Sequence, residues 1–248
     1  MQVIILAAGR GTRLMHLAQD KPKAMLLINQ KPIIGRTMEA LLKIPEISDI
    51  IVVTGYMSGQ INSYIKKEFS SPKIKLIYNG DFEAGNTLTV LKAEKSIKED
   101  FLLLNADHLF SSKAYKKIIN EAKDITLGTY DHRKAGYDEM KVRFNSDGSV
   151  EMSKTFKKYD CGYLGLTAVS KEYAKDYFDS AKKLVDSYGY NAVVEMLIFP
   201  LSKKGIKIHK CNLSNYGFLE IDTQEDYENA LRNISLLEQE DSIFNLNV

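Results

Sequence analysis

Short apolar runs alternate with helical periodicity along the first half of the chain. Four runs predict buried strands, at residues 3–7, 50–54, 74–78 and 101–105. Between them, apolar side chains recur at intervals of three and four residues and predict helices at 33–42, 60–69 and 87–97. Strands that are apolar on both faces and separated by helices are typical of a parallel sheet covered on both sides. The pattern therefore predicts an α/β fold.

The second half has a different pattern. Ser111 and Ser112 are candidate caps for a helix whose apolar positions continue to residue 122. The runs at 140–144 and 149–155 flank an Asn-Ser-Asp-Gly turn and predict a β-hairpin. Further strands are predicted at 161–169, 206–211 and 217–221, and helices near 171–186, at 191–203 and from Thr223 onward. We expect one domain: a mostly parallel sheet flanked by helices, with an inserted β-hairpin region.

Composition narrows the classes of partner. With 44% hydrophobic and 27% charged residues, the chain is globular rather than disordered. The net charge is +2 and the lysines are scattered among acids, so we expect no nucleic-acid partner. No apolar run is long enough for a bilayer, and the first residues are typical of a buried strand rather than a signal peptide. The two cysteines lack metal-ligand spacing. We expect reduced thiols in a cytoplasmic protein without membrane insertion, and a homodimer stays open.

A glycine-containing loop follows the first predicted strand and reads Leu6-Ala7-Ala8-Gly9-Arg10-Gly11-Thr12-Arg13-Leu14. Glycines allow backbone N–H groups to approach a phosphate closely. The Gly-Lys-Ser/Thr ending of a P-loop is absent, and Leu14 stands where a dinucleotide fingerprint needs its third glycine. A redox enzyme is further disfavoured because Thr54-Gly55-Tyr56 offers no ribose-binding acid after the second strand.

Two cations accompany this loop. Arg13 lies within it, and Lys23 follows in the segment Lys21-Pro22-Lys23-Ala24-Met25-Leu26. Pro22 restricts its own φ and the residue before it, so Lys23 projects from a defined turn. Backbone amides together with two full positive charges favour a triphosphate ligand. The alternative interpretation is a glycine-rich turn with solvated cations.

Asp107 and Asp222 are candidate ligands of a divalent cation. Asp107 follows the apolar run at 101–104, and Asp222 follows a short strand and precedes a helix. Sheets of this kind bind ligands at the carboxyl ends of their strands. Mg²⁺ prefers oxygen ligands and keeps several waters, so two carboxylates and triphosphate oxygens suffice to hold it. The alternatives are a loop acid for Asp107 and a helix N-cap for Asp222.

Together these segments resemble the signature of the sugar-nucleotidyltransferase superfamily. The shared elements are LAAGRGTRL at 6–14, KPKAML at 21–26 and Asp-Thr-Gln-Glu-Asp at 222–226. The resemblance implies a Rossmann-like fold and a Mg²⁺-dependent transfer of a nucleoside monophosphate from an NTP to a small phosphorylated acceptor. It also implies a single domain over 1–248, with a nucleotide-binding half at 1–130. The acceptor-binding half, at 131–248, carries the second metal aspartate.

The same resemblance implies a role for particular residues. Arg13 and Lys23 would be the catalytic cations, and Asp107 and Asp222 the ligands of Mg²⁺. The nucleotide would be bound by Leu6, Ala7, Ala8, Gly9, Gly11, Thr12, Gly55, Tyr56, Gly85, Asn86 and Ala106. Two interpretations of Asn86 stay open, contact with a pyrimidine edge and a helix cap.

His108 and Lys141 are the candidate acceptor-binding residues. A phosphate monoester already carries nucleophilic oxygens at neutral pH, so the reaction needs no general base. We therefore expect His108 to hydrogen-bond nearby backbone or a group of the acceptor. Lys141 belongs to a set of cations, with residues 132–134 and Arg143, that suits an acceptor phosphate. The alternative is a solvated basic strand.

The similarity is greatest to the CTP:inositol-1-phosphate cytidylyltransferase branch, and phosphoglutamine and phosphocholine cytidylyltransferases are similar too. The shared elements are Gly85-Asn86, Ala106-Asp107-His108, Lys141-x-Arg143 and Tyr159-Asp160-Cys161. The likeness implies CTP as the nucleotide. The chain departs from the family at residues 162–165, which read Gly-Tyr-Leu-Gly and leave the acceptor open.

Composition bears on the acceptor as well. Without Trp an aromatic choline box is less favoured, although the 14 tyrosines are a substitute. We therefore expect a polyol phosphate or a phosphorylated amino acid such as phosphoglutamine. A hexose-1-phosphate uridylyl- or thymidylyltransferase is the alternative enzyme. A non-catalytic nucleotide-binding regulatory domain is a further alternative, although it would be expected to lack Lys23 or one of the two aspartates.

Overall fold

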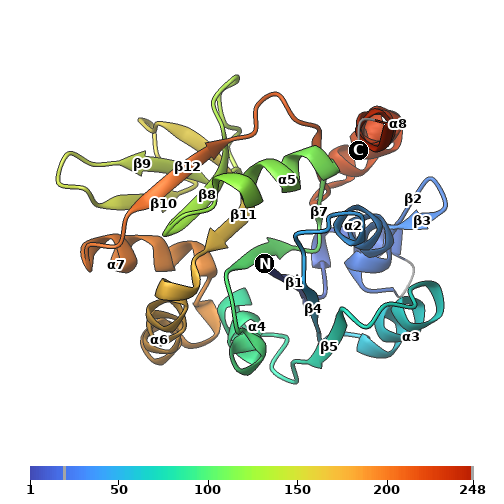
Figure 1. Cartoon of the computed structure of the whole chain (residues 1–248), viewed down its shortest axis with the longest axis horizontal. Coiled ribbons are helices and arrows are strands. Elements are labelled where there is room, and N and C mark those ends of the chain that lie inside the picture. The colour runs from blue at the N-terminus through green and yellow to red at the C-terminus, as the bar shows by residue number, and fades with distance from the viewer. Residues whose placement is uncertain (19–20, 247–248) are drawn as a thin grey trace.

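The computed structural model describes residues 1–18 and 21–246, and its centre is a nine-stranded mixed sheet (Figure 1). Four neighbouring strands run parallel, in the spatial order β6 (Phe101–Asn105), β1 (Gln2–Ala7), β4 (Asp49–Thr54) and β5 (Ile74–Tyr78). These are the four strands predicted from the apolar runs. The α/β fold expected from the sequence is confirmed.

The rest of the sheet is organised around one long strand, β11 (Cys161–Val169). It pairs antiparallel with β6, with β8 (Ile125–Tyr130) and with β9 (Lys141–Phe144). Strand β9 continues the sheet to β10 (Val150–Ser153), and β12 (Ile208–Asn212) lies parallel to β8. The predicted hairpin is β9–β10, and it extends the main sheet.

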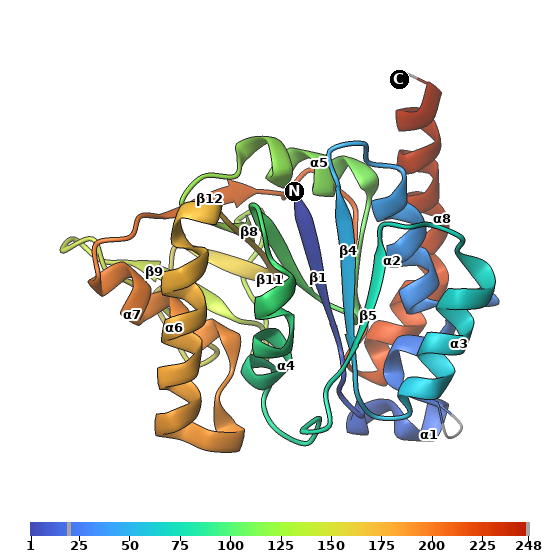
Figure 2. The same ribbon diagram turned by 60° about the horizontal axis from the view of Figure 1, so that its bottom comes forward.

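Helices cover both faces of the sheet (Figure 2). One face packs against α2 (Ile33–Leu42), α3 (Ser58–Glu68) and α5 (Ser112–Glu121), the other against α4 (Asn86–Ala93), α6 (Lys171–Tyr188) and α7 (Ile198–Lys203). Within β1, Val3 and Ile5 belong to the first core, and Ile4 and Leu6 to the second. Because both faces are buried, most positions of such a strand are apolar, which is why the strands were readable as nearly continuous runs.

A third core joins the two ends of the chain. The N-terminal part contributes the 3₁₀ turns Thr12–Leu14 and Lys23–Met25, α1 (Met15–Ala18) and the small ladder of β2 (Leu27–Ile28) and β3 (Lys31–Pro32). The C-terminal part contributes β13 (Phe218–Glu220) and α8 (Gln224–Leu246). Leu14 and Leu26 pack here with Ile221 and Ile234. The glycine loop is thereby fixed to the segment that carries Asp222.

Some elements were not predicted, and one was predicted wrongly. Strands β2, β3, β7 (His108–Phe110) and β8 were not expected; β8 is buried, but two threonines and Gly128 interrupt its apolar run. Residues 191–203 do not form one helix, because the 3₁₀ turns Gly189–Asn191 and Val194–Leu197 precede α7. The backbone there bonds to the loop before α4: the carbonyls of Tyr190 and Ala192 accept from the amides of Gly85 and Thr87.

Strand β8 lies before residue 130 in the sequence, yet it pairs with β11 and β12, which both lie after it. This pairing crosses the predicted boundary at residue 130 and does not test it. The functional division into residues 1–130 and 131–248 stays a prediction. The cap predicted for α5 is present, since the hydroxyl of Ser111 accepts from the amide of Ala114 at 3.3 Å. No helix within the described residues combines the length and the apolarity that crossing a membrane requires.

We expect the third core to contribute strongly to stability. Ile234→Ala should lower the free energy of unfolding by about 2–5 kcal/mol, because it deletes a fully buried aliphatic side chain and leaves a cavity. Leu236→Ala, on the exposed face of the same helix, should change it by less than about 0.5 kcal/mol. Urea unfolding of both variants measures the difference, and equal losses would show that α8 does not pack as described.

Candidate active site

A cavity of about 310 Å³ opens at the carboxyl ends of β1 and β6. Many predicted site residues line it: Leu6, Ala7, Ala8, Gly9, Gly11, Lys23, Asn86, Ala106, Asp107 and Asp222. Sequence reasoning missed further lining residues: Ala24, Phe82, Ala84, Thr89 and Asn105. Most of them follow β5 or β6 in the chain, so the carboxyl-end rule was a signal that pointed to them. The volume of this cavity fits one small ligand.

Several predicted nucleotide-binding residues lie beside the cavity rather than in its lining. They are Thr12, Gly55, Tyr56 and Gly85. The amide of Tyr56 donates to the carbonyl of Ala8 at 2.9 Å and so holds the glycine loop in place. The Tyr56 ring lies 6.0 Å from that of Phe82, and the Arg10 guanidinium stands over both rings. The rim therefore combines aromatic rings with a cation.

Gly11 allows Lys23 to reach the cavity. The backbone of Gly11 has φ +66°, and a Cβ there would lie 2.4 Å from the Cβ of Lys23. A larger residue at position 11 would have both a strained backbone and a clash. The aliphatic part of Lys23 is thus packed against the loop. The side chain is buried, and its ammonium contacts the two acids.

The two predicted metal ligands share one cation. The Lys23 ammonium donates to Asp107 Oδ2 and to Asp222 Oδ1, each at 2.7 Å. Arg13 pairs with the other oxygen of Asp222 and donates to Asp138 Oδ2 at 3.0 Å. Burial lowers the pKa of Lys23, but the two carboxylates outweigh it and the net shift is upward. Both acids therefore face the same positive charge.

This arrangement fits a divalent cation. Carboxylate oxygens are the ligands that Mg²⁺ prefers, and the Lys23 ammonium lies between them as a stand-in cation. Asp107 and Asp222 would be its protein ligands, as the sequence predicts. Since each carboxylate also has a cationic partner in Lys23 or Arg13, the charge of the acids is balanced without the ion.

A short ladder brings the two acids together. Strands β7 and β13 pair antiparallel, with His108 opposite Glu220. The amide of Ile221 extends the ladder by donating to the carbonyl of Asp107 at 3.0 Å. Asp107 and Asp222 therefore lie at the same end of neighbouring strands, although they are distant in sequence. The ladder was not predicted, because each of its strands has only three residues.

The Asp222 side chain does not cap helix α8, contrary to the alternative interpretation. The Thr223 hydroxyl accepts from the amide of Asp226 at 3.2 Å, and the Asp226 carboxylate accepts from the amide of Thr223 at 2.8 Å. These two bonds form the reciprocal cap at the start of α8. The Asp222 carboxylate is left to contact Lys23 and Arg13.

His108 lies behind Asp107 and is buried. Its Nδ1 lies 2.7 Å from Asp107 Oδ1, and its Nε2 lies 3.7 Å from Glu220 Oε1. Burial alone would raise the pKa of Asp107, but His108 and Lys23 hold it well below its usual range. His108 was expected to hydrogen-bond nearby backbone or a group of the acceptor. In the structure its neighbouring partner is the Asp107 side chain. Its contact with an acceptor stays a prediction.

The structure does not bring Lys141 to the cavity. Its buried ammonium donates to the carbonyls of Gly136 (2.7 Å), Glu139 (3.0 Å) and Lys154 (2.7 Å). Lys141 thereby fixes the loop at 136–139, which carries Asp138. The expectation that Lys141 binds the acceptor phosphate has no support in this geometry and stays a prediction.

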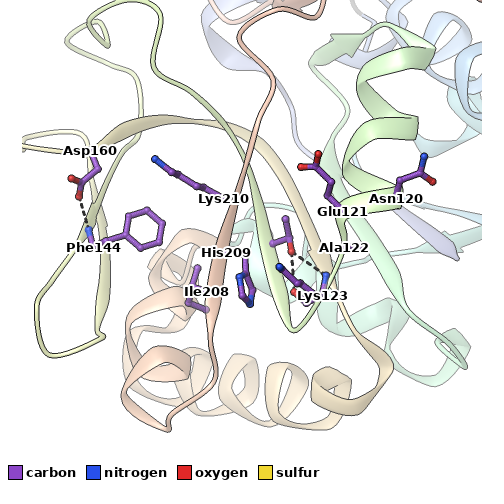
Figure 3. A pocket seen from close by; sticks show the side chains of 10 residues that line it. Asn120, Glu121, Ala122, Lys123, Phe144, Asp160, Ile208, His209 and Lys210 are labelled. Atoms are coloured by element: carbon purple, nitrogen blue, oxygen red, sulfur yellow. Dashed lines mark hydrogen bonds between the residues drawn. The ribbon is translucent and has the colours of Figure 1, made fainter.

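Larger cavities lie outside this site, and two of them exceed it in volume by more than a factor of two. One, of about 690 Å³, lies between α5 and β12 and includes Lys123, His209 and Lys210 (Figure 3). The other, of about 750 Å³, is lined by residues 131–135 and 156–159 together with Lys141. Neither contains the glycine loop or the paired acids. Volume therefore does not identify the site, whereas the convergence of loop, cations and carboxylates does.

The chain is similar in sequence to known proteins. The model of the family described as nucleotidyl transferase matches residues 2–137, more than half of the chain. The choline-phosphate cytidylyltransferase of Streptococcus pneumoniae is 28% identical over 244 residues, which are 94% of this chain and 99% of that protein. The D-glycero-alpha-D-manno-heptose 1-phosphate guanylyltransferase of Campylobacter jejuni is 28% identical over 239 residues, 94% of this chain and 100% of that protein.

Among solved structures, the inositol-1-phosphate CTP transferase from T. maritima superposes with a TM-score of 0.76. It is 20% identical in sequence, and the superposition covers 92% of this chain and 94% of that one. At this identity the likeness shows the fold alone. The predicted flanked α/β sheet is therefore confirmed both by the element order and by this comparison.

We expect the pKa of His108 to lie above its ordinary value of 6.5. Burial acts to lower it, but Asp107 and Glu220 raise it, and the charges prevail. The stabilisation from this ion pair is present below the pKa of an unfolded histidine and is lost as pH rises through the folded value. Asp107→Asn should lower the pKa of His108, as measured by NMR titration, whereas the surface variant Asp179→Asn should not. A wild-type midpoint at or below 6.5 would contradict the assignment.

Proposed function

The chain belongs to the nucleotidyl transferase family, and we propose that it is a cytidylyltransferase that joins CMP from CTP to a small phosphorylated acceptor. The observation that carries the proposal is the pair Asp107 and Asp222, which meet one ammonium at the edge of the glycine-loop cavity. Support for CTP comes from the likeness to a choline-phosphate cytidylyltransferase and an inositol-1-phosphate CTP transferase. A guanylyltransferase relative of equal identity makes the nucleotide the first point to test.

In the proposed reaction, an oxygen of the acceptor phosphate attacks the α-phosphorus of CTP. The new bond joins that oxygen to the α-phosphorus, the bond from the α-phosphorus to the bridging oxygen breaks, and pyrophosphate leaves with the electron pair. The acceptor phosphate is largely dianionic at neutral pH, so no side chain has to remove a proton. Positioning and charge neutralisation then carry most of the rate.

Each part of the site has a role in this reaction. The glycine loop would present backbone N–H groups to the triphosphate, and Arg13 and Lys23 would neutralise the leaving pyrophosphate. Asp107 and Asp222 would hold Mg²⁺, which when bound neutralises phosphate oxygens around the reacting phosphorus. Because Lys23 lies within reach of both acids and the cavity, its ammonium can exchange the carboxylates for phosphate oxygens.

For the acceptor, a polyol phosphate or a phosphorylated amino acid such as phosphoglutamine is the proposed class. The alternative, a hexose-1-phosphate uridylyl- or thymidylyltransferase, differs in both nucleotide and acceptor. A non-catalytic regulatory domain is disfavoured, because Lys23, Asp107 and Asp222 are all present and converge on one point.

We expect CTP and Mg²⁺ to give the largest pyrophosphate release. The assay combines each of CTP, UTP, GTP and dTTP with phosphorylated polyols, amino acids, amino alcohols and hexose 1-phosphates. Chelation of the metal by EDTA should abolish the signal, because the carboxylates and the triphosphate then lack their shared counter-ion. A strict preference for UTP or dTTP would support the alternative enzyme.

We expect Asp107→Ala, Asp222→Ala and Lys23→Ala each to reduce kcat by about 100-fold or more, since each removes a charge at the reacting phosphates. The matched controls are Asp179→Ala and Lys31→Ala, which alter surface ion pairs far from the cavity lining. The controls should keep wild-type turnover, and thermal unfolding checks that all five variants are folded. Full activity of Asp222→Ala would refute its role as a metal ligand.

A further inference from the structure

The segment 189–195 is attached to the rim of the nucleotide cavity. The amide of Gly85 donates to the carbonyl of Tyr190 at 2.7 Å, and Asn86 Oδ1 accepts from the amide of Val194 at 2.9 Å. Gly85 allows this contact, because a Cβ there would lie 2.0 Å from the carbonyl oxygen of Ala192. The side chain of Asn86 therefore does not cap α4, while its contact with a base stays a prediction. It positions the segment instead.

Glu195, which ends this segment, has a carboxylate with no partner on another residue. Within residues 1–18 and 21–246, its side chain makes neither an ion pair nor a hydrogen bond beyond its own backbone amide. The side chain is partly buried. Burial raises the pKa of Glu195, while the nearby cations His108 and Lys154 lower it less. A partly buried acid without a partner is costly unless a ligand compensates it.

The electrostatic influence of His108 and Asp107 on Glu195 favours a role for this carboxylate on the side from which the acceptor approaches. Phosphoryl attack and departure are roughly in line, so the acceptor enters opposite the leaving pyrophosphate. The pyrophosphate is expected at the glycine loop and Lys23. Glu195 instead interacts electrostatically with His108 and Asp107, beside the paired acids and outside the lining of the nucleotide cavity.

Three of the cations that the sequence offered for an acceptor anion, Arg133, Lys141 and Arg143, are already engaged. Arg133 pairs with Glu139 at 2.8 Å, and Arg143 pairs with Glu151 at 2.6 Å. Lys141 is bound to backbone carbonyls. These three side chains are therefore not available to an acceptor anion, and Glu220 adds a second carboxylate near Asp107, with the His108 ring at 3.7 Å.

Resting on the proposed function, we propose that Glu195 binds a positively charged group of the acceptor, which is therefore a phosphorylated amine. Its phosphate lies at the reacting phosphorus, and a short linker places its ammonium against Glu195. Phosphorylated amino alcohols and amino acids belong to this class, whereas polyol phosphates do not. Burying the ammonium against Glu195 supplies the charge that this carboxylate lacks in the free protein.

The test uses two acceptors that differ only in charge, O-phosphoethanolamine and 2-hydroxyethyl phosphate, with O-phosphoserine and phosphocholine as further amines. Wild-type kcat/KM should be about tenfold or more higher for the best amine than for the hydroxyl analogue. Glu195→Gln should raise the KM of that amine by about tenfold or more, because a neutral amide replaces the counter-ion. The KM of the hydroxyl analogue and of the nucleotide should stay within twofold, roughly the scatter of a surface change.

Glu172→Gln, an exposed acid at the start of α6, is the matched control and should match wild type. Calorimetric titration of the nucleotide into Glu195→Gln verifies that the variant is folded. Equal use of amine and hydroxyl acceptors, or an unchanged amine KM in Glu195→Gln, would overturn the inference while the proposed function stands. Pyrophosphate release with polyol phosphates but with no amine would likewise overturn the inference while the proposed function stands. If no combination of nucleotide and acceptor releases pyrophosphate, the proposed function fails and the inference fails with it.

Discussion

The site depends on one electrostatic constraint: two carboxylates from opposite ends of the sequence must face the same small volume. Left alone, Asp107 and Asp222 would repel each other, and Lys23 offsets that repulsion by donating to both. Removing one member of such a partly buried group leaves uncompensated charge, which is strongly destabilising. The surrounding structure is organised to keep the group together. The β7–β13 ladder aligns the acids, and the third core fixes the loop that carries Lys23.

The same constraint prepares the site for a change of partners. In the ligand-free protein, Lys23 and Arg13 pair with the acids, so neither Asp107 nor Asp222 lacks a counter-charge before substrate arrives. A metal-bound triphosphate brings both positive and negative groups, and the lysine can transfer its bonds to phosphate oxygens while the metal takes the carboxylates. Because the two sets of contacts exchange rather than add, the site avoids a large desolvation cost in either state.

The sequence was informative wherever a feature is local. Continuous apolar runs predicted the four parallel strands, and Gly9, Gly11 and Lys23 stood close enough in the chain to be recognised as one motif. Strand β13 lies within the strand predicted at 217–221, whereas β7 was not predicted, because three residues give no measurable period. The backbone contacts of Lys141 and Asn86 were not predicted, for another reason. Their partners are backbone groups of segments 136–139 and 190–194, and no side-chain pattern records a backbone partner.

The same contrast between local and non-local features distinguishes the nucleotide side of the proposed site from its acceptor side. The nucleotide side is built from loops that directly follow β1, β5 and β6, so neighbouring residues define it. In our proposal the acceptor side is assembled from Asp138, His108, Glu195 and Glu220, each on a different segment. Two of these segments are tied to the nucleotide side, through Arg13 to Asp138 and through Asn86 to Val194. A change of acceptor therefore requires only a few substitutions on these segments, while the phosphate-binding loop and the paired acids stay as they are.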